Sequence, residues 1–234
     1  MDFTCEEIIF NKLNNLTFPW SALSEERGEI KSVTEKENEK QVTFLIDPLD
    51  ATHNAILKFP FFSITVSVFI DGEIYMGWVF DPLRNTSYLG IKNQGAYIIQ
   101  NKNQKKLYVN TSKKLSESTV GLIRPKNENE FLRYKQLFLG SNKIRCVSCS
   151  SLEIVYVASG VYDAFADVSL VGWQKQCDIA AALLILKEAG GYIVDEKGSP
   201  INIINPSLTS LTDRFNVIAA CSTELIDEIM LYKD

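Results

Sequence analysis

Short segments in which hydrophobic and polar residues alternate, or in which hydrophobic residues run unbroken, follow one another through the first half of the chain. Patterns of this kind are typical of β-strands. The sequence predicts strands over residues 42–46, 61–70, 74–80, 87–91 and 96–100. Asp71-Gly72 separates two of these segments, and this residue pair favours a tight hairpin turn. The first half is therefore predicted to form an antiparallel sheet.

The second half of the chain mixes helical and extended patterns. Apolar residues with helical spacing predict helices over 128–139 and 150–158, and a third helix that begins at Asp178. A strand at 192–194 follows this third helix. A further helical pattern covers residues 3–13. The second half is therefore predicted to be a mixed α/β lobe.

The chain is long enough to bury a substantial core. It has 234 residues, of which 46% are hydrophobic and 23% are charged. We expect an α+β fold in a single domain, residues 1–234, with an antiparallel-sheet lobe at about 1–112 and a mixed α/β lobe at about 113–234. The charged segment 35–40 predicts an exposed loop.

A net charge of −5 argues against a nucleic-acid partner, because such a partner requires a basic face. No apolar stretch reaches the roughly 20 residues needed to span a bilayer, and no signal-peptide pattern opens the chain. We therefore expect no membrane partner and a cytoplasmic location. Cys146 and Cys149 form one Cys-x-x-Cys pair without a second pair of zinc ligands. Reduced thiols packed in the core are expected, with a redox pair as the alternative.

Two carboxylates and a hydroxyl surround a proline turn at the end of the first of these predicted strands. The sequence there is Asp47-Pro48-Leu49-Asp50-Ala51-Thr52. Proline favours extended backbone in the residue before it, so Asp47 should end the strand and the carboxylates should project beyond it. Asp47, Asp50 and the Leu49 carbonyl could converge on a hard divalent cation such as Mg²⁺. Because Asp-Pro is also a common turn former, the motif alone leaves both interpretations open.

Two further acidic segments bear on this choice. Glu25-Glu26 precedes the strand, and Asp178 begins an apolar helix that ends at Glu188-Ala189-Gly190-Gly191. The glutamate pair could be a solvated charge pair, and Asp178 could be a helix cap. A capping role does not exclude metal binding.

These three motifs, in this order, resemble the inositol monophosphatase family of Mg²⁺-dependent, lithium-sensitive sugar phosphatases. The family pattern is an acidic pair, then Asp-Pro-(Ile/Leu)-Asp-Gly-Thr-x-Asn, then Asp-x-Ala-Ala before a helix ending in Glu-Ala-Gly-Gly. The archaeal and bacterial branch, which often also accepts fructose 1,6-bisphosphate, is the more similar one. Connecting segments that resemble the family lie at 59–68, 95–97, 160–167 and 217–220. The resemblance implies the layered α-β-α-β-α sandwich of the sugar phosphatases.

The resemblance also implies a ligand set and a reaction. The implied Mg²⁺ ligands are Glu25, Asp47, the Leu49 carbonyl, Asp50 and Asp178. Thr52, Glu25 and Asp2 receive catalytic roles, Thr52 by orienting the attacking water. The implied reaction is hydrolysis of small sugar or inositol phosphate monoesters, such as inositol 1-phosphate or fructose 1,6-bisphosphate, by metal-activated water. Two or three Mg²⁺ ions, inhibition by lithium and a homodimer are expected with it.

The chain departs from the family pattern at two of these positions. Ala51 stands where the family has glycine, in the segment Asp50-Ala51-Thr52 whose backbone N–H groups would hold the phosphate. Alanine would be strained in a left-handed conformation and harmless in a helical one, and we expect the helical one. Family members usually carry a longer N-terminal helical region, and Asp2 falls where its aspartate would approach Thr52. Asp2 is either that catalytic carboxylate or a frayed helix cap.

Substrate recognition is assigned to two more residues. Asp167 could accept hydrogen bonds from a sugar hydroxyl, and Lys175 could meet a second phosphate. A strand-end aspartate and a surface lysine are the structural alternatives. Two other functions remain open, a 3′(2′),5′-bisphosphate nucleotidase of the same family and a catalytically degenerate ligand-binding homologue.

Overall fold

An eight-stranded sheet occupies the first half of the chain in the computed structural model, which describes residues 1–31, 40–112 and 114–232. Neighbouring strands are antiparallel except β1 and β3, which are parallel. In sheet order the strands are β2 (Gly28–Lys31), β1 (Trp20–Ser24), β3 (Val42–Asp50), β4 (Ser63–Ile70), β5 (Glu73–Asp81), β6 (Thr86–Ile91), β7 (Gly95–Gln100) and β8 (Asn103–Lys106).

The strands predicted for this sheet are confirmed, with ends that differ by a few residues. The predicted hairpin joins β4 to β5. Its two turn residues, Asp71 and Gly72, have φ of 51° and 82°. Positive φ at both central residues is what a tight hairpin with the correct twist requires. The loop predicted over 35–40 lies, apart from its last residue, outside the described residues.

A second, five-stranded sheet belongs to the second half of the chain. It is mixed, because β9 is parallel to both of its neighbours while β13 is antiparallel to both of its own. In sheet order its strands are β10 (Lys143–Arg145), β9 (Thr119–Leu122), β11 (Ala164–Asp167), β13 (Val217–Ala220) and β12 (Tyr192–Val194).

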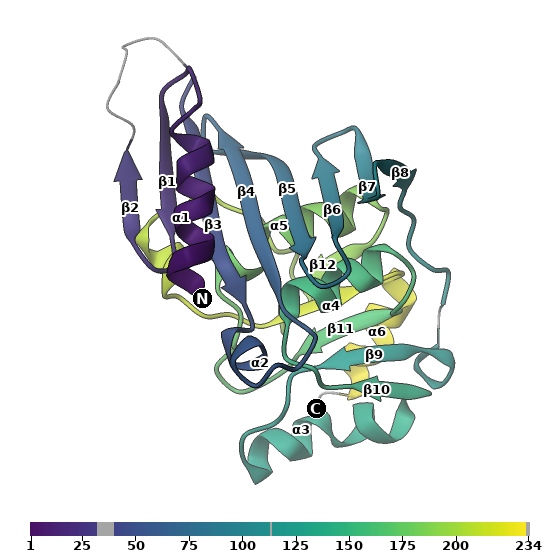
Figure 1. Cartoon of the computed structure of the whole chain (residues 1–234). Coiled ribbons are helices and arrows are strands. Elements are labelled where there is room, and N and C mark those ends of the chain that lie inside the picture. Colours follow the sequence, from purple (N-terminus) through teal and green to yellow (C-terminus); the bar gives the residue numbers. More distant parts are fainter. Residues whose placement is uncertain (32–39, 113, 233–234) are drawn as a thin grey trace.

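Six α-helices in the described residues complete five layers (Figure 1). They are α1 (Asp2–Leu13), α2 (Thr52–Ile56), α3 (Glu128–Gly140), α4 (Ser150–Ala158), α5 (Gln176–Glu188) and α6 (Thr223–Tyr232). Helix α1 covers the outer face of the first sheet, α4 and α5 lie between the sheets, and α3 and α6 cover the outer face of the second. The predicted layered sandwich is confirmed, and so are the helices predicted near the N-terminus, at 128–139, at 150–158 and after Asp178.

Helix α5 is the central element of the molecule. Its residues from Ile179 to Leu186 are all buried, as expected for a helix that is apolar on every side. It approaches the first sheet closely because two strand positions facing it are glycines. A Cβ atom on Gly77 would lie 2.8 Å from Ala181 Cα, and one on Gly90 would lie 2.8 Å from Ile185 Cα. The sheet therefore fixes α5, and with it the residues at its N-terminus.

Among the described residues, no helix combines the length and apolar character that crossing a membrane would require.

Candidate metal and phosphate site

The strand does not end at Asp47 as predicted: β3 continues through the proline segment to Asp50, and Ala51 joins it to α2. The β3–β4 pairing is irregular between Asp47 and Asp50, so this segment leaves the regular ladder. Asp47 Oδ1 accepts a hydrogen bond from the Leu49 backbone N–H at 2.9 Å, and Thr52 Oγ1 donates to the Leu49 carbonyl at 3.0 Å. These contacts hold the two aspartates and the hydroxyl in one compact turn.

Ala51 is not helical, and the expectation that it would be is wrong. Its φ is 67° and its ψ is 47°, which is the left-handed conformation. The chain turns from the end of β3 into α2 within one residue, and Ala51 is this N-terminal cap residue. In this conformation the alanine methyl group destabilises the fold by roughly 1 kcal/mol or more, whereas glycine would have no such steric penalty.

Asp50 is held by residues at the start of α4, a contact that no motif in the sequence indicated. Its Oδ2 accepts hydrogen bonds from the Ser151 backbone N–H at 3.0 Å, from the Ser151 hydroxyl and from the Cys149 thiol at 3.2 Å. Cys149 is buried, and burial raises the pKa of its thiol. Both hydroxyl and thiol therefore act as donors that orient the Asp50 carboxylate.

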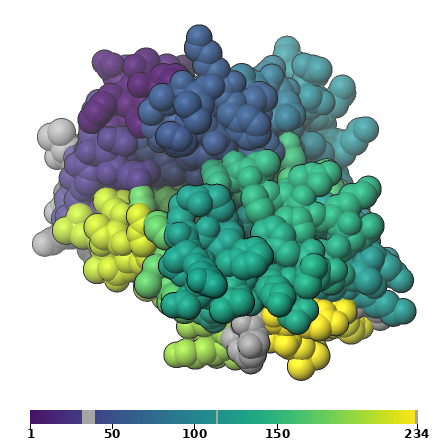
Figure 2. All heavy atoms as spheres, turned by 90° about the horizontal axis from the view of Figure 1, so that it is seen from below, coloured from purple at the N-terminus to yellow at the C-terminus, as the bar shows by residue number. Residues whose placement is uncertain are grey.

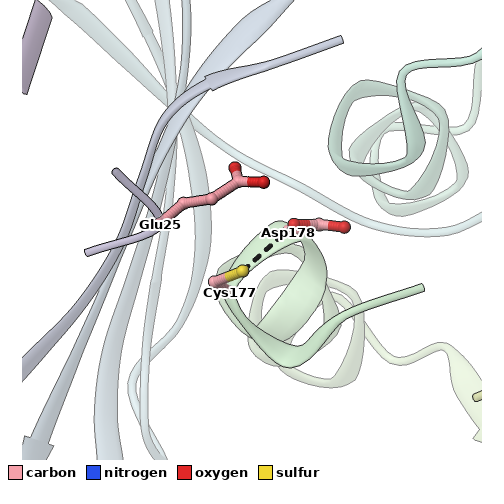
Figure 3. A group of neighbouring side chains, drawn as sticks. All are labelled: Glu25, Cys177 and Asp178. Atoms are coloured by element: carbon pink, nitrogen blue, oxygen red, sulfur yellow. Dashed lines mark hydrogen bonds between the residues drawn. The ribbon is translucent and has the colours of Figure 1, made fainter. Parts of the chain in front are cut away.

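Glu25 and Asp178 meet beside this turn (Figure 3). Glu25 follows β1, and its backbone N–H donates to the Ile46 carbonyl at 3.1 Å, immediately before Asp47 in β3. Potential ligand atoms of Glu25, Cys177 and Asp178 all lie within 4.8 Å of one another. Asp178 is the third residue of α5; its Oδ2 accepts from the Lys175 backbone N–H at 3.3 Å and its Oδ1 from the Cys177 thiol at 3.1 Å. Asp178 therefore caps the helix from its third position and not as the N-cap residue, and its role as a metal ligand stays a prediction.

The electrostatics of these carboxylates indicate a shared site. Burial, and then the charges of its acidic neighbours, raise the pKa of Asp47 well above its usual value. Burial also raises the pKa of Asp50, and burial with the charge of Asp50 raises that of Asp178 to about 7. Each carboxyl group thus ionises less readily, because it is shielded from water and because its negative charge would be repelled by the neighbouring carboxylates. A divalent cation among them would remove this penalty, and an oxygen-rich ligand set suits Mg²⁺.

Lys175 also enters this group. Its Nζ forms a close ion pair with Glu25 Oε1 and lies 3.9 Å from Asp178 Oδ1. Only 17% of its side chain is exposed. The lysine predicted to meet a second phosphate therefore points its ammonium group into the cluster of carboxylates.

The last two predicted site residues are placed differently. Asp2 begins α1, and its Oδ1 is buried without a hydrogen-bond partner in the described chain. After burial, the charge of Asp2 helps to raise the pKa of Glu26, so Asp2 lies near the Glu25-Glu26 pair. Asp167 is fully buried, and its oxygens accept hydrogen bonds from Ser169, Trp173 and Gln174. It anchors the loop after β11 and presents no exposed oxygen to a sugar, so the structure does not support the predicted contact.

The cysteines form no disulfide in the described residues. Cys146 is exposed and Cys149 is buried, and both are free thiols. Cys149 is thus packed in the core as predicted, whereas Cys146 is not, and the redox state of the pair stays a prediction.

The residues brought together here come from both halves of the chain. Glu25 and the β3–α2 turn belong to the first half, while α4 and the start of α5 belong to the second. Figure 2 shows the face seen from below, where the blue atoms of the first half adjoin the green atoms of the second. Sites between two packed parts of a protein are the usual location of small-molecule binding.

The chain is similar to known phosphatases over almost its entire length. The model of the inositol monophosphatase family matches residues 1–228. A fructose-1,6-bisphosphatase/inositol-1-monophosphatase of Methanothermobacter thermautotrophicus is 31% identical, covering 98% of this chain and 81% of the relative. An inositol-1-monophosphatase of Mesorhizobium japonicum is 28% identical, and the match covers 89% of this chain and 76% of that relative.

Among solved structures, a hypothetical protein from Pyrococcus horikoshii with similarities to inositol-1 monophosphatase superposes with a TM-score of 0.81. It shares 27% identity, and the match covers 99% of this chain and 83% of that one. The motifs, the layered fold and these similarities agree with one another. The chain belongs to the inositol monophosphatase family, whose members include the phosphatases named above.

Proposed function

We propose that this protein is a Mg²⁺-dependent phosphatase that hydrolyses small sugar or inositol phosphate monoesters. Two observations support the proposal: ligand atoms of Glu25 and Asp178 lie within 4.8 Å of one another, and the charges of Asp50, Asp178 and Glu25 add to burial in raising the pKa of Asp47. Relatives named for inositol 1-phosphate and fructose 1,6-bisphosphate support these two compounds as the first substrates to test.

The proposed cation ligands are Glu25, Asp47, the Leu49 carbonyl, Asp50 and Asp178. All offer oxygen, the donor that Mg²⁺ prefers. When bound, the cation supplies positive charge for the phosphoryl oxygens and eases loss of a proton from the attacking water. We propose two or three ions, with lithium as an inhibitor.

Thr52 is the proposed water-orienting residue. Its hydroxyl proton is used in the hydrogen bond to the Leu49 carbonyl, which leaves its oxygen as an acceptor. A water molecule that donates to this oxygen has a lone pair free to face the phosphorus atom. Asp2 and Glu25 are the carboxylates proposed to assist its deprotonation. The backbone N–H groups of residues 50–52 are proposed to hold the phosphate oxygens.

A phosphate-release assay with a Mg²⁺ titration tests the proposal. The panel contains inositol 1-phosphate, fructose 1,6-bisphosphate and adenosine 3′,5′-bisphosphate, the last to detect the nucleotidase alternative. We expect release that requires Mg²⁺, that is greatest for one of the first two esters and that falls when lithium is added. Highest turnover of the adenosine compound would favour the nucleotidase, and no release from any ester would favour a ligand-binding homologue.

Asp47→Asn is the variant that links this activity to the site. The amide cannot supply the negative charge that a shared cation ligand provides, so we expect phosphate release to fall by about a thousandfold or more. Asp213→Asn, at an exposed position outside the site, is the control and should retain full activity. Full activity of Asp47→Asn would contradict the proposed role of the carboxylates.

Two broader properties belong to the proposal. Members of this family are commonly homodimers, and we propose the same assembly and a cytoplasmic location for this chain. Light scattering of the purified protein tests the assembly directly.

A further inference from the structure

The Lys175 ammonium group lies between two carboxylates of the proposed metal site. Lys175 Nζ forms its closest contact with Glu25 Oε1 and lies 3.9 Å from Asp178 Oδ1. These two carboxylates belong to the proposed ligand set and come from different halves of the chain. The side chain of Lys175 is 17% exposed, so the ammonium is directed inward.

The position of Lys175 follows from its place in the fold. It is the residue immediately before α5, and its backbone N–H is capped by the Asp178 carboxylate. Because α5 is fixed against the first sheet, the lysine stem starts at a defined point beside Glu25. Because the ammonium group is attached to the chain by a short side chain, its effective concentration near Glu25 is high. It can therefore neutralise the carboxylates in part without a cation from solution.

We propose that Lys175 is a built-in counter-cation, which pairs with Glu25 and Asp178 in the metal-free protein and is displaced when a divalent ion binds. The inference rests on the proposed metal site and adds a property of this chain, an internal competitor for that site. A single positive charge only partly neutralises the four acidic groups, so a divalent ion still binds. It binds more weakly than it would to the same carboxylates without the lysine, because the ion pair must first be broken.

The proposal makes two linked statements about Lys175→Met. The metal-free variant should be less stable than the parent, because Glu25 and Asp178 lose the cation with which they pair. Its Mg²⁺ dissociation constant should be about tenfold lower, the change expected when one partly buried ion pair no longer competes. Calorimetric titration with Mg²⁺ alone gives the affinity, and thermal unfolding with a chelator or with Mg²⁺ gives the stability.

Lys187→Met is the matched control, since it removes the same charge from the exposed far end of the same helix. It should change neither quantity. Lys175→Arg keeps the positive charge and should keep metal-free stability and Mg²⁺ affinity close to those of the parent. A Lys175→Met protein that folds only when Mg²⁺ is present would be the extreme form of the expected result.

Three outcomes would overturn the inference. An unchanged or weaker Mg²⁺ affinity in Lys175→Met means that the lysine does not compete for the site. A variant that stays unfolded with saturating Mg²⁺ means that the lysine is needed whether or not the ion is bound. If the parent itself binds no Mg²⁺, the proposed function fails together with this inference, whereas the first two outcomes leave the proposed function intact.

Discussion

Two residues with left-handed backbone flank the contacts of the Asp50 carboxylate. Ala51 follows Asp50 directly, with φ of 67°, and Ser148 precedes Cys149, with φ of 60°. Neither is glycine, so each conformation is held at a cost by the surrounding structure. Backbone strain of this kind is often concentrated at functional sites, where it fixes the direction of a side chain.

Replacing Ala51 by glycine should stabilise the protein. Glycine removes the steric cost of the left-handed conformation but adds freedom to the unfolded chain, so the expected net gain is about 0.5–1 kcal/mol in the free energy of unfolding. Urea denaturation measures it. Ala55→Gly, a few residues further along in α2, is the control and should lower stability by roughly 0.5–1 kcal/mol because its backbone is helical. A loss of stability in Ala51→Gly would contradict the strain assigned to this position.

Individual site residues differed in how far the sequence could identify them. Asp47, Asp50 and Asp178 lie in motifs whose spacing itself restricts the backbone. Nothing in the sequence placed Ser151 and Cys149 beside Asp50, because this contact joins residues a hundred positions apart. The conformation of Ala51 was predicted wrongly for the same reason, since the angle between β3 and α2 is set by packing and not by alanine.

The contact between α5 and the first sheet depends on two glycines in facing strands. Every side chain from Ile179 to Leu186 is buried, so α5 has no face that could turn toward water to relieve a clash. A methyl group on Gly77 or Gly90 would meet the α5 backbone. The position of Asp178, and with it the geometry of the site, therefore depends on small residues far from it in the sequence.

Gly77→Ala should destabilise the protein by about 2–3 kcal/mol, because the new methyl group forces the sheet and α5 apart. Chemical denaturation measures the loss, and Mg²⁺ affinity should weaken with it as Asp178 moves. Ser67→Ala, at the position paired with Gly77 on β4, is the control. The Ser67 hydroxyl is buried without a hydrogen-bond partner in the described chain, so its removal should be neutral or stabilising. Equal stability of Gly77→Ala and the parent would show that α5 is not held this tightly.

The longer elements were predictable and several short ones were not. Strands β3 to β7 have enough alternating or unbroken apolar positions to be recognised, and α4 was predicted with its correct ends. Strands β9 and β10, of four and three residues, are too short to carry a period. The parallel pairing of β1 with β3 could not be predicted, because it joins segments separated by a long connection.

The fold brings buried carboxylates together from both halves of the chain. The free energy of unfolding should therefore depend on pH and on bound cations. Burial and the neighbouring charge of Asp50 raise the pKa of Asp178 from 3.8 to about 7. The folded protein therefore binds this proton more tightly than the unfolded chain does. By linkage, protonation of Asp178 stabilises the folded state most below about pH 4. This stabilisation is lost as the pH rises toward 7.

Metal-free protein should accordingly lose stability between about pH 5 and pH 7.5, relative to Asp178→Asn, which has no proton to release at this position. With saturating Mg²⁺, the stability of the parent and of Asp178→Asn should change with pH in the same way, because the ion replaces the proton as the partner of the Asp178 carboxylate. Urea denaturation at the two pH values, with a chelator or with Mg²⁺, provides the comparison. Parallel pH profiles of the parent and Asp178→Asn without metal would refute it.

The amino-acid sequence determined the family, the strand and helix periods and the order of the three acidic motifs. These properties are local, since each depends on residue types within one short segment and on the backbone they favour. Only the tertiary structure decided that Ala51 is left-handed, that Ser151 and Cys149 hold Asp50, that Asp167 faces its own loop and that Lys175 pairs with Glu25. Each of these depends on the distance and angle between segments remote in the chain, which are set by packing α5 between the two sheets.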